Sequence, residues 1–167
     1  MSVNTGDEAP VLTVDAYVRD EAAPVETRVG GPAESWTVLF FYPRDFTFLC
    51  PAELRGFAEL EAAFALDGAS VMAASTDSWH VHRAWLETSS GLTRIRYPVL
   101  ADPAQELTRT YGVLNPDDGS ALPATFIIDP SGTVRDVSFA GPGTRRRPEE
   151  TLETLRELRI SELQAVA

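Results

Sequence analysis

The chain has 167 residues, of which 44% are hydrophobic and 23% charged, and this length suits one domain with a sizeable core. Asp and Glu number 25 against 14 basic residues, so the formal net charge is −11 at pH 7. An acidic surface opposes contact with the phosphates of nucleic acids and with anionic lipids. We therefore expect residues 1–167 to form a single domain that binds neither nucleic acid nor a membrane.

Cys50 is the only cysteine of the sequence. One thiol cannot form an intrachain disulfide, a CxxC redox pair or a multi-cysteine zinc site. The first ten residues, MSVNTGDEAP, lack the basic and apolar stretches of a secretory signal, and no apolar run approaches the ~18 residues that span a bilayer. These features predict a cytoplasmic protein with a reduced thiol.

The first half of the chain shows strand patterns around one long helical pattern. Apolar and polar residues alternate in 11–18 and again in 25–29, which predicts a small hairpin. The segment 36–43, WTVLFFYP, is a continuous apolar run typical of a central strand buried on both faces. Apolar residues at helical spacing predict one helix over 50–68, and SVMAAST at 70–76 predicts a second buried strand.

The second half continues the alternation of strands and helices. The patterns predict a helix within 78–91, a short strand at 97–103, a short helix at 104–112, a hairpin at 125–141 and an amphipathic helix at 148–163. This order predicts an α/β domain with a thioredoxin-like fold, in which helices flank a central mixed sheet and a hairpin precedes it.

Cys50 stands where the predicted central strand gives way to a helix. Ligand sites in open α/β sheets gather beyond the carboxyl ends of the strands. Pro51 suits the first position of a helix, and Glu53 could complete a capping arrangement. Free backbone N–H groups and the positive end of a helix favour the thiolate, which is the nucleophile. The alternative is a buried, inert cysteine that acts as a small apolar side chain.

The residues around Cys50 carry a family signature. Residues 43–50, PRDFTFLC, read P-x-x-x-T-x-x-C and continue with Pro51-Ala52-Glu53. This run resembles the peroxidatic site of peroxiredoxins of the alkyl hydroperoxide reductase C / thiol-specific antioxidant type, whose usual run is close to FYPxDFTFxCPxE. The resemblance extends over residues 5–163 and includes these further segments: Ser75–Ser78 with His82 and Trp85, Tyr97–Pro103, Tyr111–Val113, Thr125–Gly132 and the helix at 148–163.

The resemblance implies a thiol-dependent peroxidase, in which Cys50 attacks the terminal oxygen of a peroxide and becomes a sulfenic acid. It implies that Thr47 orients the peroxide and the thiolate and that Pro43 shields the cysteine. We expect the substrate pocket to be formed by Phe46, Glu53, Pro123 and Arg44. The backbone N–H of Cys50 would stabilise the charge that develops on oxygen. From the residues alone, Thr47 could be only a local cap and Pro43 only a strand terminator.

No cofactor is implied, and no metal is expected. His80 and His82 point about 200° apart on a helix, which is unfavourable for a shared metal ion. The run Arg145–Arg147 could bind an anionic partner, but a solvated loop before a helix that begins with proline is the better interpretation.

The first departure from the family concerns a cation. The family places an arginine just before its T-F-I-I-D strand, where it contacts the cysteine and the peroxide, and Pro123 stands at this position here. A charge-assisted hydrogen bond is worth about 1.5–3 kcal/mol, so its loss would lower the rate of peroxide reduction roughly 10–100-fold. Arg44 could replace this cation, although a solvated surface position is the better interpretation. The dipeptide Leu122-Pro123 also predicts a cis-proline that faces the cysteine, as in other thioredoxin-fold proteins.

The second departure is the lack of a resolving cysteine, which typical relatives carry in a C-terminal tail. A sulfenate at Cys50 would then be reduced by an external thiol, either a low-molecular-weight thiol or a thioredoxin-like protein, or would form a disulfide between subunits. The resemblance also implies a homodimer or a higher homo-oligomer. Two alternatives to a peroxidase stay open. The fold could serve a non-peroxidase reaction or binding role, for example in specialised metabolism, or the chain could be a peroxide-sensing interaction protein.

Overall fold

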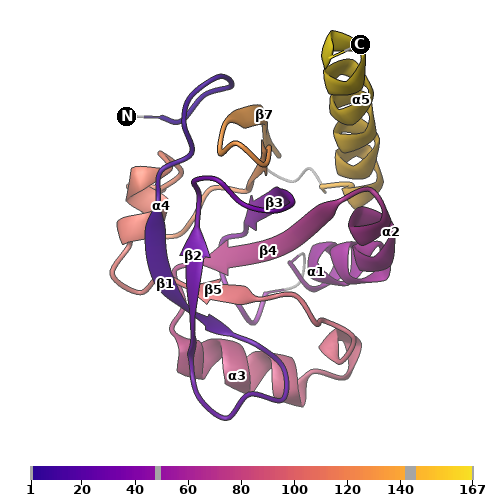
Figure 1. Ribbon diagram of the computed structural model, residues 1–167. Coiled ribbons are helices and arrows are strands. Elements are labelled where there is room, and N and C mark those ends of the chain that lie inside the picture. The colour runs from indigo at the N-terminus through magenta and orange to yellow at the C-terminus, as the bar shows by residue number, and fades with distance from the viewer. Residues whose placement is uncertain (1, 48–49, 142–145, 167) are drawn as a thin grey trace.

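A seven-stranded mixed sheet forms the centre of the computed structural model, which describes residues 2–47, 50–141 and 146–166 (Figure 1). The strand order is β2-β1-β5-β4-β3-β6-β7. The strands are β1 (Leu12–Tyr17), β2 (Val25–Val29), β3 (Trp36–Phe41), β4 (Ala69–Ser75), β5 (Val99–Ala101), β6 (Ala124–Ile128) and β7 (Val134–Phe139). The helices are α1 (Cys50–Glu59), α2 (Glu61–Leu66), α3 (Trp79–Thr88), the 3₁₀ turn η1 (Ser90–Leu92), α4 (Glu106–Thr110) and α5 (Pro148–Val166).

Strand β3 is the central strand that the sequence predicts. It pairs with β4 in parallel and with β6 in antiparallel orientation, and five of its six residues are buried. Phe40 and Phe41 point to opposite faces of the sheet, because side chains alternate along a strand. The Phe40 ring stacks on Phe57 of α1 with 4.1 Å between the centroids, whereas Phe41 packs edge-on against Phe126. Both faces of β3 therefore lie in the core.

The predicted N-terminal hairpin is confirmed and extends the main sheet. Strands β1 and β2 pair in antiparallel orientation, and Ala16 and Tyr17 of β1 pair with β5. Gly30 follows the hairpin with φ of +80°, and a Cβ there would collide with the carbonyl oxygen of Pro10. Glycine is therefore required at this turn.

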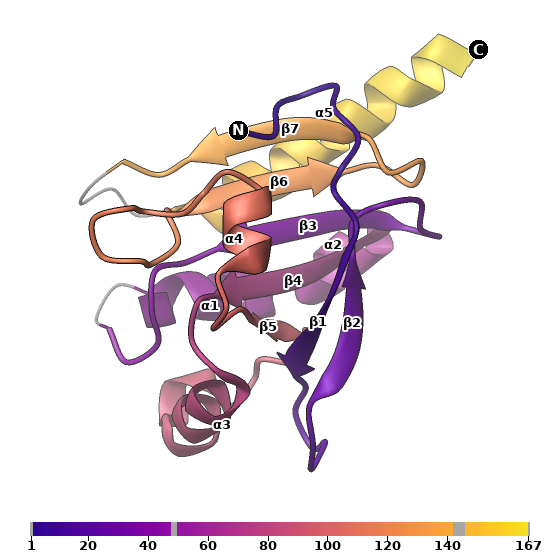
Figure 2. The same ribbon diagram turned by 90° about the vertical axis from the view of Figure 1, so that its left-hand side faces the viewer.

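The helices cover the sheet unequally. Helices α1, α2, α3 and α5 contribute to the core around Phe40, whereas α4 contributes Leu107 to the core around Phe41 on the opposite face. Figure 2 shows α4 on the near side of the sheet and α2 and α5 on the far side. No helix within the described ranges is long and apolar enough to cross a membrane.

The helix predicted over 50–68 is interrupted in the structure. Leu60 separates α1 from α2 and has φ of −98° and ψ of 2°, outside the usual helical values. The rings of Phe57 and Phe64 nevertheless stack with 6.0 Å between their centroids, so both helices keep their apolar faces on the same core. The other predicted elements are confirmed within a few residues of their expected ends.

Candidate active site

The connection from β3 to α1 carries the predicted site. Tyr42 continues the pairing of β3 through a hydrogen bond from its N–H to the carbonyl oxygen of Ala74, 3.0 Å. The ten-residue helix α1 then begins at Cys50, with Pro51 next to it, as the sequence predicts. Residues 48–49 and the Cys50 side chain lie outside the described part of the chain. The backbone thus places Cys50 at a helix start beyond the end of the central strand, where a thiolate is favoured.

Asp45 fixes the loop that precedes Cys50. The side chain is buried, with 6% exposed, and its Oδ1 accepts a hydrogen bond from the Tyr42 hydroxyl at 2.5 Å. Its Oδ2 lies 2.6 Å from Nδ1 of His82, and its backbone N–H donates to Oδ2 of Asp77 at 2.9 Å. The loop is therefore held at once by the end of β3, by α3 and by the segment between β4 and α3.

His82 and Asp45 share one proton. Nε2 of His82 lies 2.9 Å from the carbonyl oxygen of Leu100, which can only accept, so Nε2 carries a hydrogen. The contact between Nδ1 and Asp45 then needs a further proton, carried either by the imidazole or by the carboxyl group. Burial raises the pKa of Asp45, and the hydrogen bond and charge of His82 counteract part of this rise.

The same cluster is the one group of described residues whose geometry resembles a metal site. One ligand atom each from Asp45, Asp77 and His82 lies within 4.8 Å of the others. Asp45 and His82 are hydrogen-bonded to each other, and Oδ2 of Asp77 accepts a hydrogen bond from the Ser75 hydroxyl at 2.6 Å. Because their hydrogen bonds satisfy the cluster internally, we interpret it as a structural network. His80, two residues before His82, is exposed on the other side of α3.

Three predicted site residues lie in the loop that Asp45 fixes. The Thr47 hydroxyl donates to the carbonyl oxygen of Arg44 at 3.2 Å, which closes a local turn and leaves its lone pairs free to accept. Pro43 is half-buried at the end of β3. Phe46 has φ of +59° and is 61% exposed, with its ring 6.0 Å from Trp85.

Arg44 occupies the solvated position that the sequence favours. Its side chain is half exposed, and Nη2 donates to the carbonyl oxygen of Asp118 at 2.8 Å. The carboxylate of Asp118 lies 3.8 Å from the same nitrogen. Arg44 therefore links the loop before Cys50 to the loop that leads into β6.

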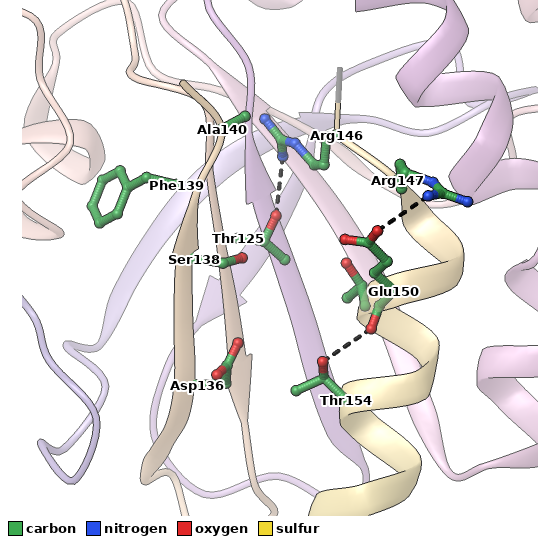
Figure 3. A pocket seen from close by; sticks show the side chains of 10 residues that line it. Thr125, Asp136, Ser138, Phe139, Ala140, Arg146, Arg147, Glu150 and Thr154 are labelled. Atoms are coloured by element: carbon green, nitrogen blue, oxygen red, sulfur yellow. Dashed lines mark hydrogen bonds and ion pairs between the residues drawn. The ribbon is translucent and has the colours of Figure 1, made fainter. Parts of the chain in front are cut away.

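Arg146 corrects the interpretation of 145–147 as a solvated loop. Arg146 is buried, with 8% exposed, whereas Arg147 is exposed, and residue 145 lies outside the described part. The Arg146 guanidinium donates to Oγ1 of Thr125, as Figure 3 shows. It also donates to the carbonyl oxygens of Phe41 and Ala124. A buried cation thus lies where β3 ends and β6 begins.

Glu53 is the counter-charge of this arginine. It is 7% exposed, and its Oε1 accepts from the backbone N–H of Arg146 at 3.0 Å while Oε2 lies 3.6 Å from Nε. The sequence predicts that Glu53 completes a capping arrangement with Cys50, whose side chain lies outside the described part together with residues 48–49. The described contacts of Glu53 join the first turn of α1 to the segment before α5. Arg146 can be buried because this carboxylate and three oxygens satisfy it.

Pro123 does not adopt the predicted cis geometry. The described residues contain no cis peptide bond, so the expectation for Leu122–Pro123 is wrong. The carbonyl oxygen of Pro123 instead accepts from the N–H of Ala140 at 3.0 Å and extends the ladder between β6 and β7. The Arg146 guanidinium reaches the carbonyl oxygen of Ala124, the residue that follows Pro123.

Comparisons with known proteins agree with this fold. The AhpC/TSA family model matches residues 5–137. Peroxiredoxin tpx1 of Schizosaccharomyces pombe is 38% identical over 158 residues, which cover 93% of this chain and 81% of that protein. Peroxiredoxin prdx-2 of Caenorhabditis elegans is 37% identical over 160 residues, which cover 94% of this chain and 79% of that protein. The crystal structure of Enterococcus faecalis AhpC superimposes with a TM-score of 0.89 at 32% identity and covers 99% of this chain and 97% of that one.

The fold, the cysteine at the start of α1 and these matches define an enzyme of the peroxiredoxin type, an oxidoreductase that acts on peroxides. The chain belongs to the AhpC/TSA family, which confirms the family and the thioredoxin-like fold predicted from its sequence.

Proposed function

We propose that the chain reduces hydrogen peroxide or small organic hydroperoxides through a sulfenic acid at Cys50. The observation that carries this proposal is the position of Cys50 as the first residue of α1, directly beyond the central strand β3. Backbone N–H groups are unpaired at such a position, and they stabilise both the thiolate and the negative charge of the transition state.

The proposed reaction has two half-reactions. The thiolate of Cys50 attacks the terminal oxygen, the O–O bond breaks, and the departing alkoxide or hydroxide takes a proton to become alcohol or water. Thr47 is suited to accept a hydrogen bond from the peroxide, because its own hydrogen is engaged by Arg44. One external thiol then forms a mixed disulfide and releases water, and a second thiol regenerates Cys50.

The remaining site residues receive these proposed roles. Pro43 shields the cysteine, and Phe46 and Pro123 lie at the rim of the substrate pocket. Glu53 acts through Arg146, which it holds against the ends of β3 and β6.

A homodimer in the cytoplasm is the proposed state of the chain. Strand β7 is the last strand of the sheet and pairs only with β6. On its outer edge, the backbone of Val134 is hydrogen-bonded to residues 6 and 7. The rest of this edge has no backbone hydrogen bond within the described part of the chain. Phe139 at the end of this strand is 57% exposed. An open edge strand is a template for pairing with a second copy.

The proposed location in the cytoplasm is supported by the single cysteine, because the oxidised Cys50 needs a reducing compartment to return to the thiol.

The test is the rate of the first step. Stopped-flow mixing of the reduced protein with one equivalent of hydrogen peroxide should consume the Cys50 thiol far faster than free cysteine is consumed, and dimedone should trap the sulfenic acid. Addition of an external dithiol should then give repeated turnover. A rate equal to that of free cysteine would overturn the proposal.

Substitution Pro123→Arg should accelerate this first step. The new guanidinium would stand where relatives carry theirs and add a charge-assisted hydrogen bond in the transition state, which predicts a rise of roughly 10–100-fold in the rate of Cys50 oxidation. The matched variant Pro123→Ala removes the ring without adding a charge and should leave the rate nearly unchanged. Equal rates for both variants would show that position 123 does not contact the reacting atoms.

A further inference from the structure

A charged groove follows the outer side of α1. It consists of two adjoining cavities that share Arg55 and Glu59. The first has a volume of about 430 Å³ and lies between α1 and the start of α5, and the second has about 210 Å³ and lies between α1 and the segment 90–95. Together they have the size of sites for small ligands. We call this feature the α1 groove and define it by these residues: Ala52, Arg55, Glu59, Arg94, Arg147 and Glu149.

The α1 groove gathers cations on an acidic protein. The chain has a net charge of −11, yet three exposed arginines line this one surface. Within the described ranges, the side chains of Arg55 and Arg94 have no hydrogen-bond or ion-pair partner, and the side chain of Arg147 forms only an exposed pair with Glu150 at 3.4 Å. Guanidinium groups prefer carboxylate partners, with which they form two parallel hydrogen bonds.

The groove also contains carboxylates, which narrows the class of ligand. Glu59 and Glu149 stand among the three exposed arginines. Arg146 also lines the first cavity, but it is buried and pairs with Glu53. The exposed lining therefore carries three positive and two negative charges, which suits a ligand that carries carboxylates together with an ammonium group. Amino acids and short peptides have this combination of charges.

Two glycines shape the walls of the groove. A Cβ at Gly91 would lie 2.9 Å from a guanidinium nitrogen of Arg55, so Arg55 lies directly against the backbone of the segment after α3. A Cβ at Gly56 would lie 2.8 Å from Cγ of Pro148, so the start of α5 can approach α1 closely. Arg55 and Pro148 therefore pack closely against the walls of the groove.

The α1 groove begins at the same helical turn as the predicted nucleophile. Ala52 belongs to the first turn of α1, which starts at Cys50. Arg55 lies five residues after Cys50, which is about 7.5 Å along the helix axis and about 140° around it. An extended peptide of about three residues covers both this rise and the separation around the helix. A peptide-like thiol whose carboxylate binds Arg55 can thus span the distance to the start of the helix.

We propose that the α1 groove binds the carboxylates of a small, peptide-like thiol that reduces the oxidised Cys50. This inference rests on the proposed peroxidase function and names its reductant by chemical class. The bound thiol attacks the sulfur of the Cys50 sulfenic acid, a mixed disulfide forms and water leaves. A second thiol then attacks the mixed disulfide, which releases the small disulfide and the Cys50 thiolate.

The experiment separates the two half-reactions. The sulfenic acid is first formed with one equivalent of peroxide, and its reduction is then followed with glutathione or with glutathione diethyl ester, which has the same thiol and no free carboxylate. Glutathione should react roughly five to ten times faster than the ester at low ionic strength, and added salt should reduce this ratio. The double variant Arg55→Gln/Arg147→Gln should bring the ratio close to one.

Arg109→Gln is the matched control, because Arg109 is an exposed arginine of α4 on the opposite face of the sheet. It should keep the wild-type ratio. Equal rates with both thiols, or a ratio that the double variant leaves unchanged, would overturn the inference. Failure of the peroxide step itself would overturn the proposed function instead. Binding of S-methylglutathione to the reduced protein, followed by amide chemical shifts in α1, tests the groove independently of both reactions.

Discussion

Replacing Cys50 with serine is expected to abolish peroxide reduction. A serine hydroxyl is not ionised near neutral pH, so it provides no nucleophile for the O–O bond. The fold should persist, because serine is among the preferred residues at the start of a helix. Peroxide consumption with an external thiol should fall to the rate without enzyme, while circular dichroism and the unfolding midpoint stay close to those of the wild type.

The Cys50→Ser variant also distinguishes a peroxidase from a protein whose fold serves a non-peroxidase role. If Cys50→Ser consumed peroxide at the wild-type rate, the reaction would not depend on this sulfur, and the proposed mechanism would be wrong. A strain that carries Cys50→Ser and keeps the full biological function would favour recruitment of the fold to another role. The Pro123→Arg variant serves as a positive control, because it should change the rate while it leaves the nucleophile in place.

The central features of the fold could be predicted because they depend on local patterns. The apolar run 36–43 is long enough only for a strand and has no polar face, which is the pattern of a strand buried on both sides. The motif around Cys50 then identified the family from adjacent residues. The break at Leu60 was missed, since the apolar spacing continues across it without a glycine or proline.

The polar contacts of the site were harder to predict because they join distant segments. Glu53 and Arg146 are 93 residues apart, and a run of arginines before a proline-initiated helix has the pattern of a solvated loop. Asp45 and His82 are 37 residues apart, and helical spacing alone does not show that His82 faces a carboxylate. The cis-proline expectation transferred a feature of other thioredoxin folds to Pro123, where the ladder between β6 and β7 continues instead.

Asp45→Ala is expected to destabilise the protein strongly. The substitution removes the acceptor of the Tyr42 hydroxyl and the partner of His82 Nδ1, and both groups are fully buried. Loss of one member of a buried pair costs about 3–5 kcal/mol in the free energy of unfolding. Asp45→Asn should cost much less, because its oxygen can accept from Tyr42 and its NH₂ group can donate to neutral His82. Urea denaturation at neutral pH compares the two variants. An equal loss in both would show that the charge, and not the hydrogen bonds, stabilises the loop.

The difference in the free energy of unfolding between the wild type and Asp45→Asn should change with pH in one direction. Burial raises the pKa of Asp45 above its ordinary value of 3.8, so the folded protein holds this proton more tightly than the unfolded chain does. The resulting stabilisation is complete below the unfolded pKa and is lost as the pH rises through the folded pKa. The amide side chain of the Asp45→Asn variant does not titrate. The free energy of unfolding of the wild type should therefore decrease relative to that of the variant as the pH is raised from about 4 toward neutrality. An increase in this difference with pH would mean that the protonated imidazole of His82 lowers the pKa of Asp45 more than burial raises it.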